Sequence, residues 1–184
     1  MKHPFLIGEK IYLRRVERED LGGNYFQWLN DTEVLRWMFN GAFPNSVEAM
    51  EAYYQGVVSG RTDIVFAIIL KEDERHVGNI GIHRIEPIAR SAEIGILIGE
   101  RDVWGRGIGT EAIGLLAGHA FLRLNLNRLY AGAHEANAGC LRAFEKNGFR
   151  REGVARQAMY VGGAYGNVVN LGLLRSEWNV PARS

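Results

Sequence analysis

Hydrophobic and polar positions follow two different periods along this chain, and the change of period divides the chain into two parts. Residues 64–70 are almost all apolar, and residues 77–85 form a second apolar run after a charged turn, which predicts a β-hairpin. Residues 91–98 predict the next strand. From residue 108 to residue 124, apolar residues instead recur every three or four positions, which is typical of an amphipathic helix.

Shorter signals predict the remaining elements. Asn30-Asp31 and Asn45-Ser46 have side chains that cap helix N-termini, and Gly148 is typical of a helix end. Further strands are predicted at residues 10–16, 128–133, 149–160 and 168–174, and further helices at residues 21–29, 33–38, 47–58 and 137–147. The order is strand, helices, three strands, helix, strand, helix and two strands, so we expect an α/β protein with one mixed, largely antiparallel sheet.

The length and composition fit an ordinary globular protein. With 184 residues, 47% of them hydrophobic, the chain predicts a single domain over residues 1–184. Its 22 Lys and Arg nearly balance 21 Asp and Glu, so the composition favours neither a nucleic-acid nor an anionic-membrane partner. No apolar run is long enough to span a bilayer, and the N-terminus lacks a signal-peptide pattern. Cys140 is the only cysteine, which excludes an intrachain disulfide, argues against a cysteine-rich metal site and fits the reducing cytoplasm.

The most informative segment lies between the strand at residues 91–98 and the helix that begins near residue 108. Gly105, Gly107 and Gly109 stand there at alternate positions. Glycine lets the backbone adopt positive φ angles and approach a ligand closely, and the first turn of a helix offers free N–H groups. Strand, glycine loop and helix N-terminus together predict a site for a pyrophosphate.

Three phosphate-binding loops and a purely structural turn compete for this segment. A P-loop requires Gly-Lys followed by Ser or Thr, and the chain has no such triplet. A dinucleotide fingerprint is matched literally by Gly107, Gly109 and Ala112, with Glu135 as the acidic ribose partner. However, hairpins precede it, and residues 99–106 separate it from the strand. The third loop is a coenzyme A cradle.

Several blocks in a fixed order resemble the GNAT superfamily of acetyl-CoA-dependent N-acetyltransferases. They are Ala92-Glu93-Ile94-Gly95, the run from Trp104 to Ala112, Asn137, and residues 143–153 with Asn147-Gly148-Phe149 at their centre. The resemblance covers residues 10–178 and is greatest to the RimJ/RimL-like branch, with its ribosomal-protein N-terminal, polyamine and amino-sugar acetyltransferases. It implies the GNAT fold, in which two central strands splay apart, and acetyl-CoA as cosubstrate without a metal.

The resemblance also implies which residues hold acetyl-CoA. Backbone groups of the splayed strand would bond the pantetheine, and the N–H of Leu97 would also stabilise the oxyanion. Amide groups of the glycine loop would hold the pyrophosphate, and Arg106 either adds charge there or is a solvated loop residue. Asn137 would bond the pantetheine or a backbone carbonyl. The implied cofactor-binding residues are Ile96, Leu97, Ile98, Trp104, Gly105, Arg106, Gly107, Ile108, Gly109, Thr110, Asn137 and Phe144.

Transfer to an amine needs a base, because an alkylamine with a pKa of about 10 is mostly protonated at neutral pH. Glu93 is the expected base, since it is a carboxylate within an apolar strand, where burial raises a carboxyl pKa. The alternative for Glu93 is an ion pair with Arg84 or Arg90. The rival bases are Glu135 and His134, and His83 either lies near the substrate side of its strand or is a structural histidine.

The residues at the positions that donate a proton to the leaving thiolate differ from those usual in the superfamily. Many relatives have tyrosine at the position of Phe144, which has no hydroxyl. RimJ/RimL-like enzymes place serine where Cys140 stands, so Cys140 either donates a weak hydrogen bond to the thiolate or is a small buried helix residue. These departures keep a second function open, that of a noncatalytic acyl-CoA-binding module.

The acceptor is expected to bind near residues 21–58, which resemble the superfamily least, and near the hairpin after Tyr160. Trp28, Trp37, Met38 and Phe39 either line an acceptor pocket or belong to the core, and Asp31, Glu33, Glu48 and Glu51 either attract an amine or are solvated. We expect a primary amine: a protein N-terminal amine, or a small amine such as a polyamine, an aminoglycoside or an amino-sugar nucleotide. A homodimer is also compatible with the sequence.

Overall fold

The computed structural model describes residues 1–60 and 62–178, and at residues 39 and 40 it describes the backbone without the side chains. Within these residues one sheet contains β1 (Leu6–Ile7), β2 (Ile11–Arg15), β3 (Ile64–Leu70), β4 (His76–Glu86), β5 (Ser91–Ile98), β6 (Arg128–His134), β7 (Arg150–Val161) and β8 (Ala164–Leu174). The α-helices are α1 (Asn24–Trp28), α2 (Val47–Ser59), α3 (Ile108–Leu122) and α4 (Ala138–Lys146). Short 3-10 helices lie at Arg18–Gly22, Phe39–Ala42 and Arg101–Val103.

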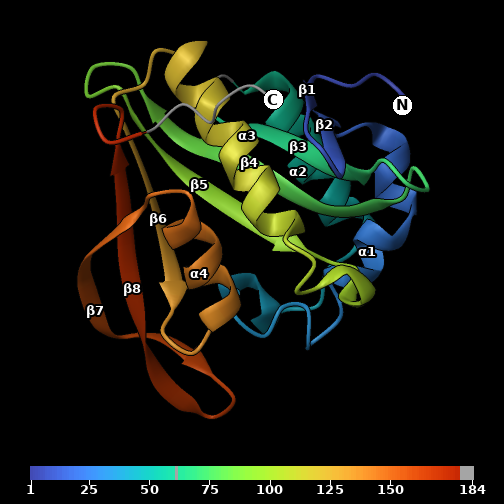
Figure 1. Cartoon of the computed structure of the whole chain (residues 1–184). Helices are drawn as coiled ribbons and strands as arrows, with labels where there is room; N and C mark the ends of the chain where they lie inside the picture. The colour runs from blue at the N-terminus through green and yellow to red at the C-terminus, as the bar shows by residue number, and fades with distance from the viewer. Residues whose placement is uncertain (61, 179–184) are drawn as a thin grey trace.

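The strands run across the sheet in the order β1-β2-β3-β4-β5-β6-β8-β7. All neighbours are antiparallel except β5 and β6, which are parallel because α3 crosses over between them. Their pairing begins at Ser91 with Arg128 and ends at Glu93 with Tyr130. Beyond that pair the two strands diverge, and Figure 1 shows the gap widening toward the end of the molecule that holds the loop before α3. The structure therefore confirms the mixed α/β sheet with splayed central strands.

Helices cover both faces of the sheet (Figure 1). The main apolar core lies between the sheet and α3 and α4, where Ile80 of β4 and Ile94 of β5 pack with Leu116 of α3. Smaller apolar clusters on the other face join the sheet to α1 and α2. Side chains alternate along a strand, so Glu93, Gly95 and Leu97 of β5 face α1 and α2. This second face is the one that contains the cavity described below.

Two helices predicted from the sequence differ in the structure. Residues 33–38 form turns, because Oδ1 of Asp31 accepts the N–H groups of Glu33 (2.9 Å) and Val34 (3.3 Å) and Arg101 holds the same carboxylate. This Asx turn uses the N–H groups locally, and the helix predicted there is wrong. The helix predicted at residues 21–29 is divided at Gly23, whose backbone is extended between the first 3-10 helix and α1.

Other local signals were correct. Oγ of Ser46 accepts the N–H of Ala49 (3.1 Å) and caps α2 as predicted. β8 begins at Ala164, four residues before the predicted start, because cross-strand pairing with β7 extends the strand to the hairpin turn. β1 was not predicted, since two residues show no periodicity. In the described part of the chain, no helix has the length and apolar character needed to cross a bilayer.

Candidate active site

The gap between β5 and β6 leaves one edge of β5 without a strand partner. Nε1 of Trp104 donates to the carbonyl of Ile98 (2.9 Å), so this carbonyl points away from β4. The carbonyl of Leu97 points the other way, since a Cβ on Gly78 of β4 would collide with it. Peptide groups alternate in direction along a strand, so Ile96 directs its N–H and C=O into the gap. The backbone groups of Ile96 and Ile98 therefore point into the gap. The backbone groups of Leu97, the predicted oxyanion donor, point toward β4.

The glycine loop has the backbone geometry expected of an anion site. Gly105 and Gly107 have φ angles of 77° and 85°, which other residues rarely adopt. Gly107 is the N-cap of α3, and the first helical hydrogen bond runs from the N–H of Glu111 to the carbonyl of Gly107 (3.0 Å). The three preceding N–H groups, those of Ile108, Gly109 and Thr110, have no helical partner. They lie at the positive end of the helix dipole, where an anion is stabilised.

Two other N–H groups of the predicted set are used within the loop. The N–H of Trp104 donates to the carbonyl of Arg101 (3.1 Å), and the N–H of Arg106 donates to that of Val103 (3.3 Å). These bonds hold the loop in shape, so the N–H groups of Trp104 and Arg106 are not free to bind a phosphate in this structure.

Two cations lie at the same loop. The guanidinium of Arg106 pairs with Glu72 (2.8 Å), so part of its charge is already neutralised. Nζ of Lys10 donates to the carbonyl of Arg106 (3.1 Å), which places a second positive charge beside the loop. Sequence reasoning missed Lys10, because it precedes the loop by 96 residues and no local motif includes it.

The block around Asn147 holds α4 against the start of α3. Nδ2 of Asn147 donates to the carbonyls of Thr110 (2.9 Å) and Ala143 (2.8 Å). Phe144 is 1% exposed and packs edge to face against Phe149, so it lies in the core. These contacts fix the first turn of α3, and a direct contact of Phe144 with the cofactor stays a prediction.

Asn137 and Cys140 belong to the start of α4. Oδ1 of Asn137 accepts the N–H of Cys140 (3.2 Å), so Asn137 is the N-cap of this helix. The side-chain bond to a backbone carbonyl that was expected of Asn137 is instead made by Asn147. Cys140 is half-buried against the main core, and burial raises the pKa of its thiol to about 11. The thiol therefore keeps its proton at neutral pH.

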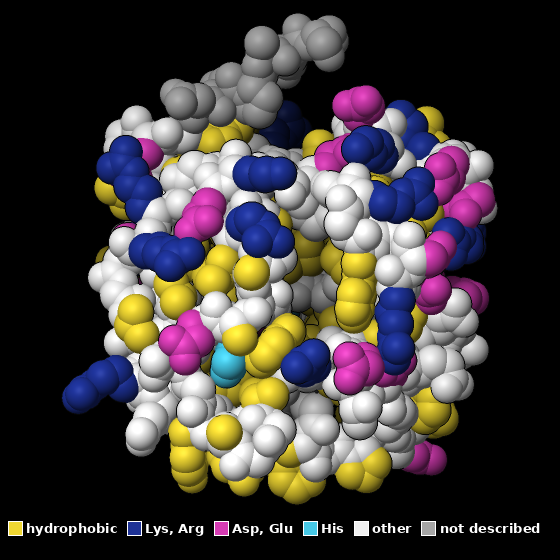
Figure 2. Space-filling view, turned by 60° about the horizontal axis from the view of Figure 1, so that its bottom comes forward, with side chains coloured by type: hydrophobic (Ala, Val, Ile, Leu, Met, Phe, Trp, Pro, Cys, Tyr) yellow, Lys and Arg dark blue, Asp and Glu magenta, His cyan; other side chains and the backbone are white. Residues whose placement is uncertain are grey.

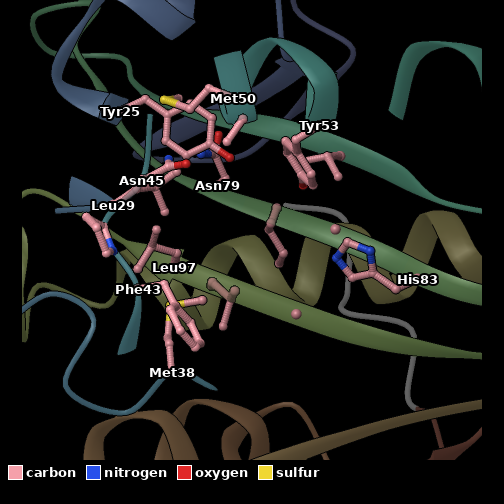
Figure 3. Close-up of a pocket in the computed structure, with 17 residues that line it drawn as sticks. Tyr25, Leu29, Met38, Phe43, Asn45, Met50, Tyr53, Asn79, His83 and Leu97 are labelled. Atoms are coloured by element: carbon pink, nitrogen blue, oxygen red, sulfur yellow. The ribbon is translucent and has the colours of Figure 1, made fainter. Parts of the chain in front are cut away.

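A cavity of about 410 Å³ lies on the face of the sheet that α1 and α2 cover, a volume typical of small-molecule sites. Asn79, Gly81 and His83 of β4 and Gly95 and Leu97 of β5 line its floor, and Tyr25, Leu29, Met38, Phe43, Met50 and Tyr53 line its walls (Figure 3). No Asp or Glu is among the described residues that line it. Figure 2 shows a hollow at the end of the molecule where β5 and β6 diverge, with hydrophobic side chains around it and charged ones farther out.

Asn79, which lines this cavity, has an amide donor without a hydrogen-bond partner among the described residues. Nε2 of His76 lies 2.9 Å from both the carbonyl of Gly78 and Oδ1 of Asn79. A carbonyl can only accept, so Nε2 carries a proton and Asn79 directs its oxygen toward it. Nδ2 of Asn79 is then left without a hydrogen-bond partner in the part of the chain that the structure describes, although the residue is only 7% exposed. A buried donor without an acceptor costs about 1–3 kcal/mol, which indicates a position for a ligand oxygen.

His83 lies across the glycines of the cavity floor. A Cβ on Gly81 would collide with its Nε2, and a Cβ on Gly95 would crowd its ring. Nδ1 of His83 is 2.8 Å from Oδ1 of Asp63, which directly precedes β3. Burial alone would raise the pKa of Asp63, but the hydrogen bonds from His83 and Thr62 outweigh it, and this pKa lies below its ordinary value. Asp63 is therefore a carboxylate at neutral pH.

Glu93, the predicted base, lies opposite His83 in the register of β4 and β5. Its carboxylate forms an ion pair with Arg84 (3.0 Å), and its side chain is 30% exposed. The ion pair that the sequence offered as the alternative is therefore present, and the carboxylate is only partly buried. A role for Glu93 in proton transfer stays a prediction.

The rival bases at the end of β6 are occupied by other contacts. Glu135 accepts hydrogen bonds from Nδ2 and the N–H of Asn167, and these bonds lower its pKa. Nδ1 of the buried His134 accepts the N–H of Ala136 (3.1 Å), and its ring stacks on Trp37 at 4.5 Å between centroids. Neither Glu135 nor His134 lines the cavity under α1 and α2.

Some of the residues predicted for the acceptor region line the cavity, and others lie elsewhere. Met38 lines the cavity, whereas Trp28 is 4% exposed and donates through Nε1 to Glu100 (2.9 Å), so Trp28 is a core residue. The side chain of Phe39 lies outside the described residues. Four acidic residues proposed to attract the amine are absent from the cavity lining: Asp31, Glu33, Glu48 and Glu51. Asn79 and Asp63 were not singled out, because an isolated amide or carboxylate has no motif.

Comparison with known proteins identifies the family. A family model described as an acetyltransferase (GNAT) domain matches residues 10–150. The chain belongs to the GNAT acetyltransferases. The uncharacterized N-acetyltransferase p20 of Bacillus licheniformis is 30% identical to this GNAT protein, over 94% of this chain and 97% of its relative. The resemblance found in the sequence is thus confirmed, and this GNAT protein is an acetyl-CoA-dependent N-acetyltransferase.

Other relatives differ in the acceptors that their names give. The putative ribosomal N-acetyltransferase YdaF of Bacillus subtilis is 30% identical, over 94% of this chain and 95% of that protein. The spermidine N(1)-acetyltransferase of Escherichia coli is 27% identical, over 91% of this chain and 88% of that protein. The crystal structure of a Vibrio cholerae spermidine N-acetyltransferase with CoA and spermine shares the fold, with a TM-score of 0.85 and 24% identity over 92% of this chain and 98% of that one.

Proposed function

We propose that this GNAT enzyme transfers the acetyl group of acetyl-CoA to a primary amine that enters the cavity between the sheet and α1 and α2. One observation carries the proposal: residues 95–97 of β5 border both the edge left free by β6 and the cavity. A thioester held along that edge and an amine bound in the cavity would meet at β5. Such proximity is the main requirement of acyl transfer between two bound substrates.

The donor side suits acetyl-CoA, which supplies an activated acyl group when bound. Ile96 would bond the pantetheine amides through the free edge of β5. The N–H groups at the start of α3 would hold the pyrophosphate, and Lys10 would add a positive charge beside it. Cys140, whose thiol is protonated, would donate a weak hydrogen bond to the departing sulfur.

The cavity lining favours an amine carried by an uncharged body. The walls are apolar and aromatic, and no carboxylate is among the described lining residues. A polyamine has further cationic nitrogens, whose burial without carboxylate partners is unfavourable. Spermidine acetyltransferases are among the relatives, but for this chain we propose a protein N-terminal α-amine or a small monoamine.

The floor of the cavity supports an acceptor with an oxygen close to its amine. Nδ2 of Asn79 needs an acceptor, and Nε2 of His83 lies over Gly81, two residues farther along β4. Two residues of a strand span roughly 7 Å. The N-terminal residue of a peptide has an amine and a carbonyl oxygen that would fit between two such groups.

Deprotonation of the amine is assisted by Glu93 in this proposal. Glu93 lies on the cavity face of β5 without lining the cavity, and its carboxylate would take up the proton released by the amine through solvent once its ion pair with Arg84 opens. Glu93→Gln is then expected to lower the rate at neutral pH, and high pH is expected to restore part of it because the amine ionises without help. A pH–rate profile identical to that of the wild type would contradict this role.

The function is tested by measuring CoA thiol release with a panel of amines. Short peptides with a free and with a blocked N-terminus form the matched pair, and spermidine, an aminoglycoside and an amino-sugar nucleotide complete the panel. We expect release with free N-termini or small monoamines and much less with spermidine. Tight acetyl-CoA binding without thiol release for any amine would overturn the proposal and favour a noncatalytic acyl-CoA-binding module.

A further inference from the structure

We infer that His83 is the group that takes the proton from the acceptor amine, and that Asp63 is the positioning residue that prepares it. This inference rests on the function proposed above, because it concerns the same cavity. Three observations carry it: the place of the imidazole on the cavity floor, the contact between His83 and Asp63, and the free Nε2 atom.

The imidazole can lie on the floor only because two glycines lie under it. Gly81 neighbours His83 on the same face of β4, and Gly95 pairs with Gly81 from β5. A Cβ on Gly81 would collide with Nε2, and one on Gly95 would lie 3.2 Å from the ring. Both glycines have ordinary φ angles, so no turn explains their presence. They leave the space that holds the ring against the sheet, beside the end of β5 that faces the gap.

The contact with Asp63 decides which nitrogen of His83 faces the substrate. A carboxylate only accepts hydrogen bonds, so Nδ1 of His83 donates to Asp63 (2.8 Å) and Nε2 keeps its lone pair. Nε2 has no hydrogen-bond partner among the described residues, and it lies over Gly81 in the cavity. The same logic operates wherever a carboxylate fixes the tautomer of a histidine base.

The charges around His83 support this role. The titratable and charged groups that approach it are Asp63 before β3, Tyr53 on α2, Tyr25 on α1, and the Arg84–Glu93 ion pair between β4 and β5. Arg84 is neutralised by Glu93 and its side chain is 76% exposed, so the charge nearest to the imidazole is that of Asp63. A negative neighbour stabilises the imidazolium that forms when the amine gives up its proton.

The reaction balances with these groups. The ammonium gives one proton to Nε2 of His83, which becomes an imidazolium. The freed nitrogen lone pair attacks the thioester carbonyl, the C–N bond forms and the C–S bond breaks. The second proton lost by the nitrogen goes to the departing thiolate, directly or through solvent, and yields CoA. His83 returns its proton to solvent, so one proton is released for each acetyl group transferred.

The inference is tested with His83→Gln, His83→Ala and Asp63→Asn, each compared with His119→Gln, a histidine on α3 at the far side of the sheet. We expect His83→Gln to lower kcat by about 10²-fold or more at pH 7 and to remove the part of the pH–rate profile that belongs to the base. Asp63→Asn should lower kcat less, and the double variant should be no worse than His83→Gln alone, because both act as one unit. Added imidazole should restore part of the activity of His83→Ala.

Acetyl-CoA affinity and thermal unfolding of each variant show whether it folds, and both should match the wild type closely. A folded His83→Gln variant with wild-type kcat and an unchanged pH profile would overturn the inference. Loss of activity in His83→Ala without rescue by imidazole would also overturn it, since a merely structural histidine behaves in that way. These outcomes require an active wild type, so they are distinguishable from failure of the proposed function, in which no amine gives thiol release.

Discussion

The two sides of the proposed active site are built from different groups. The donor side is mainly backbone: the free edge of β5, two glycines with positive φ in the loop, and the first N–H groups of α3. The acceptor side is mainly side chains, with Asn79 and His83 on a glycine floor under aromatic walls. Backbone sites need a particular order of glycines and helix starts, whereas a side-chain pocket needs only that distant residues meet.

This difference has a functional consequence. A pyrophosphate cradle made of N–H groups binds the same cosubstrate whatever side chains surround it. The acceptor is chosen by the shape and charge of the other pocket, where an uncharged lining excludes some amines and admits others. Changes on the donor side should therefore alter acetyl-CoA binding, and changes on the acceptor side should alter amine binding and proton transfer.

The largest expected effect concerns the structural support of the acceptor side. Arg14 and Asp20 form two hydrogen bonds of 2.8 and 2.7 Å, with both side chains 9% exposed. Arg14→Met leaves the Asp20 carboxylate buried without its partner, so the free energy of unfolding should fall by about 3–5 kcal/mol. Urea unfolding measures this loss. Arg36→Met is the control, since the exposed pair of Arg36 with Glu33 should contribute less than about 1 kcal/mol.

The same pair predicts a pH dependence of stability. Burial alone would raise the pKa of Asp20, but the hydrogen bonds from Arg14 and from the N–H of Glu17, together with the nearby charges of His76 and Arg14, outweigh it, and this pKa lies below its ordinary value. The pair therefore stabilises the fold above the unfolded pKa of about 3.9, and this stability is lost as pH falls below it. Urea midpoints of wild type and Arg14→Met should converge on acidification, and a constant difference down to pH 3 would contradict the assignment.

The donor side is tested by Gly107→Val. The φ angle of 85° is strained for valine by roughly 1–2 kcal/mol, and the side chain would disturb the N-cap of α3. We expect acetyl-CoA affinity to fall by about tenfold to a hundredfold, measured by calorimetry, with little change in the KM of the amine. Gly163→Val is the matched control, because Gly163 has a φ of 86° with open space around it in the turn between β7 and β8. Equal losses of acetyl-CoA affinity in both variants would show that backbone strain lowers the affinity, and not damage to a phosphate-binding loop.

Asn79→Leu on the acceptor side is expected to have a smaller effect, and to change amine binding where Gly107→Val changes acetyl-CoA binding. This change removes a buried donor without a partner and also the Oδ1 that accepts from His76, whose Nε2 keeps the carbonyl of Gly78, so the melting temperature should change little. The KM of the amine should increase by about tenfold, since one hydrogen bond to the substrate is lost, whereas acetyl-CoA affinity should not change. A lower melting temperature together with an unchanged amine KM would indicate that Asn79 serves the fold alone.

The smallest effect is expected at Cys140. With a pKa of about 11, about one thiol in a thousand is ionised at pH 8, so iodoacetamide should react far more slowly with Cys140 than with N-acetylcysteine. The alkylation rate should rise about tenfold per pH unit in this range. Cys140→Ala should change kcat by less than about threefold, because a thiolate leaves readily without a proton. A hundredfold loss would instead give Cys140 a central role in protonating the leaving group.

Local signals were sufficient for most elements and for locating the glycine loop before α3. Ser46 was found as a cap because its partner is three residues away, and the loop before α3 was found because its glycines are adjacent to a strand and a helix. The helix expected at residues 33–38 failed because Arg101, far along the chain, holds Asp31 in a turn. Glu93 was expected to be buried, but it is partly exposed and forms an ion pair with Arg84 on the neighbouring strand.

The sequence by itself determined most of the strands and helices, the glycine loop proposed to hold the pyrophosphate and the membership of the GNAT acetyltransferases, because each depends on local patterns along the chain. Only the tertiary structure decided that Lys10 lies at the glycine loop, that Leu97 turns toward β4, and that Asp63 and His83 share a hydrogen bond across 20 residues. The physical reason is that a side-chain pocket forms where separate elements pack, and packing brings together residues whose spacing in the chain has no pattern of its own.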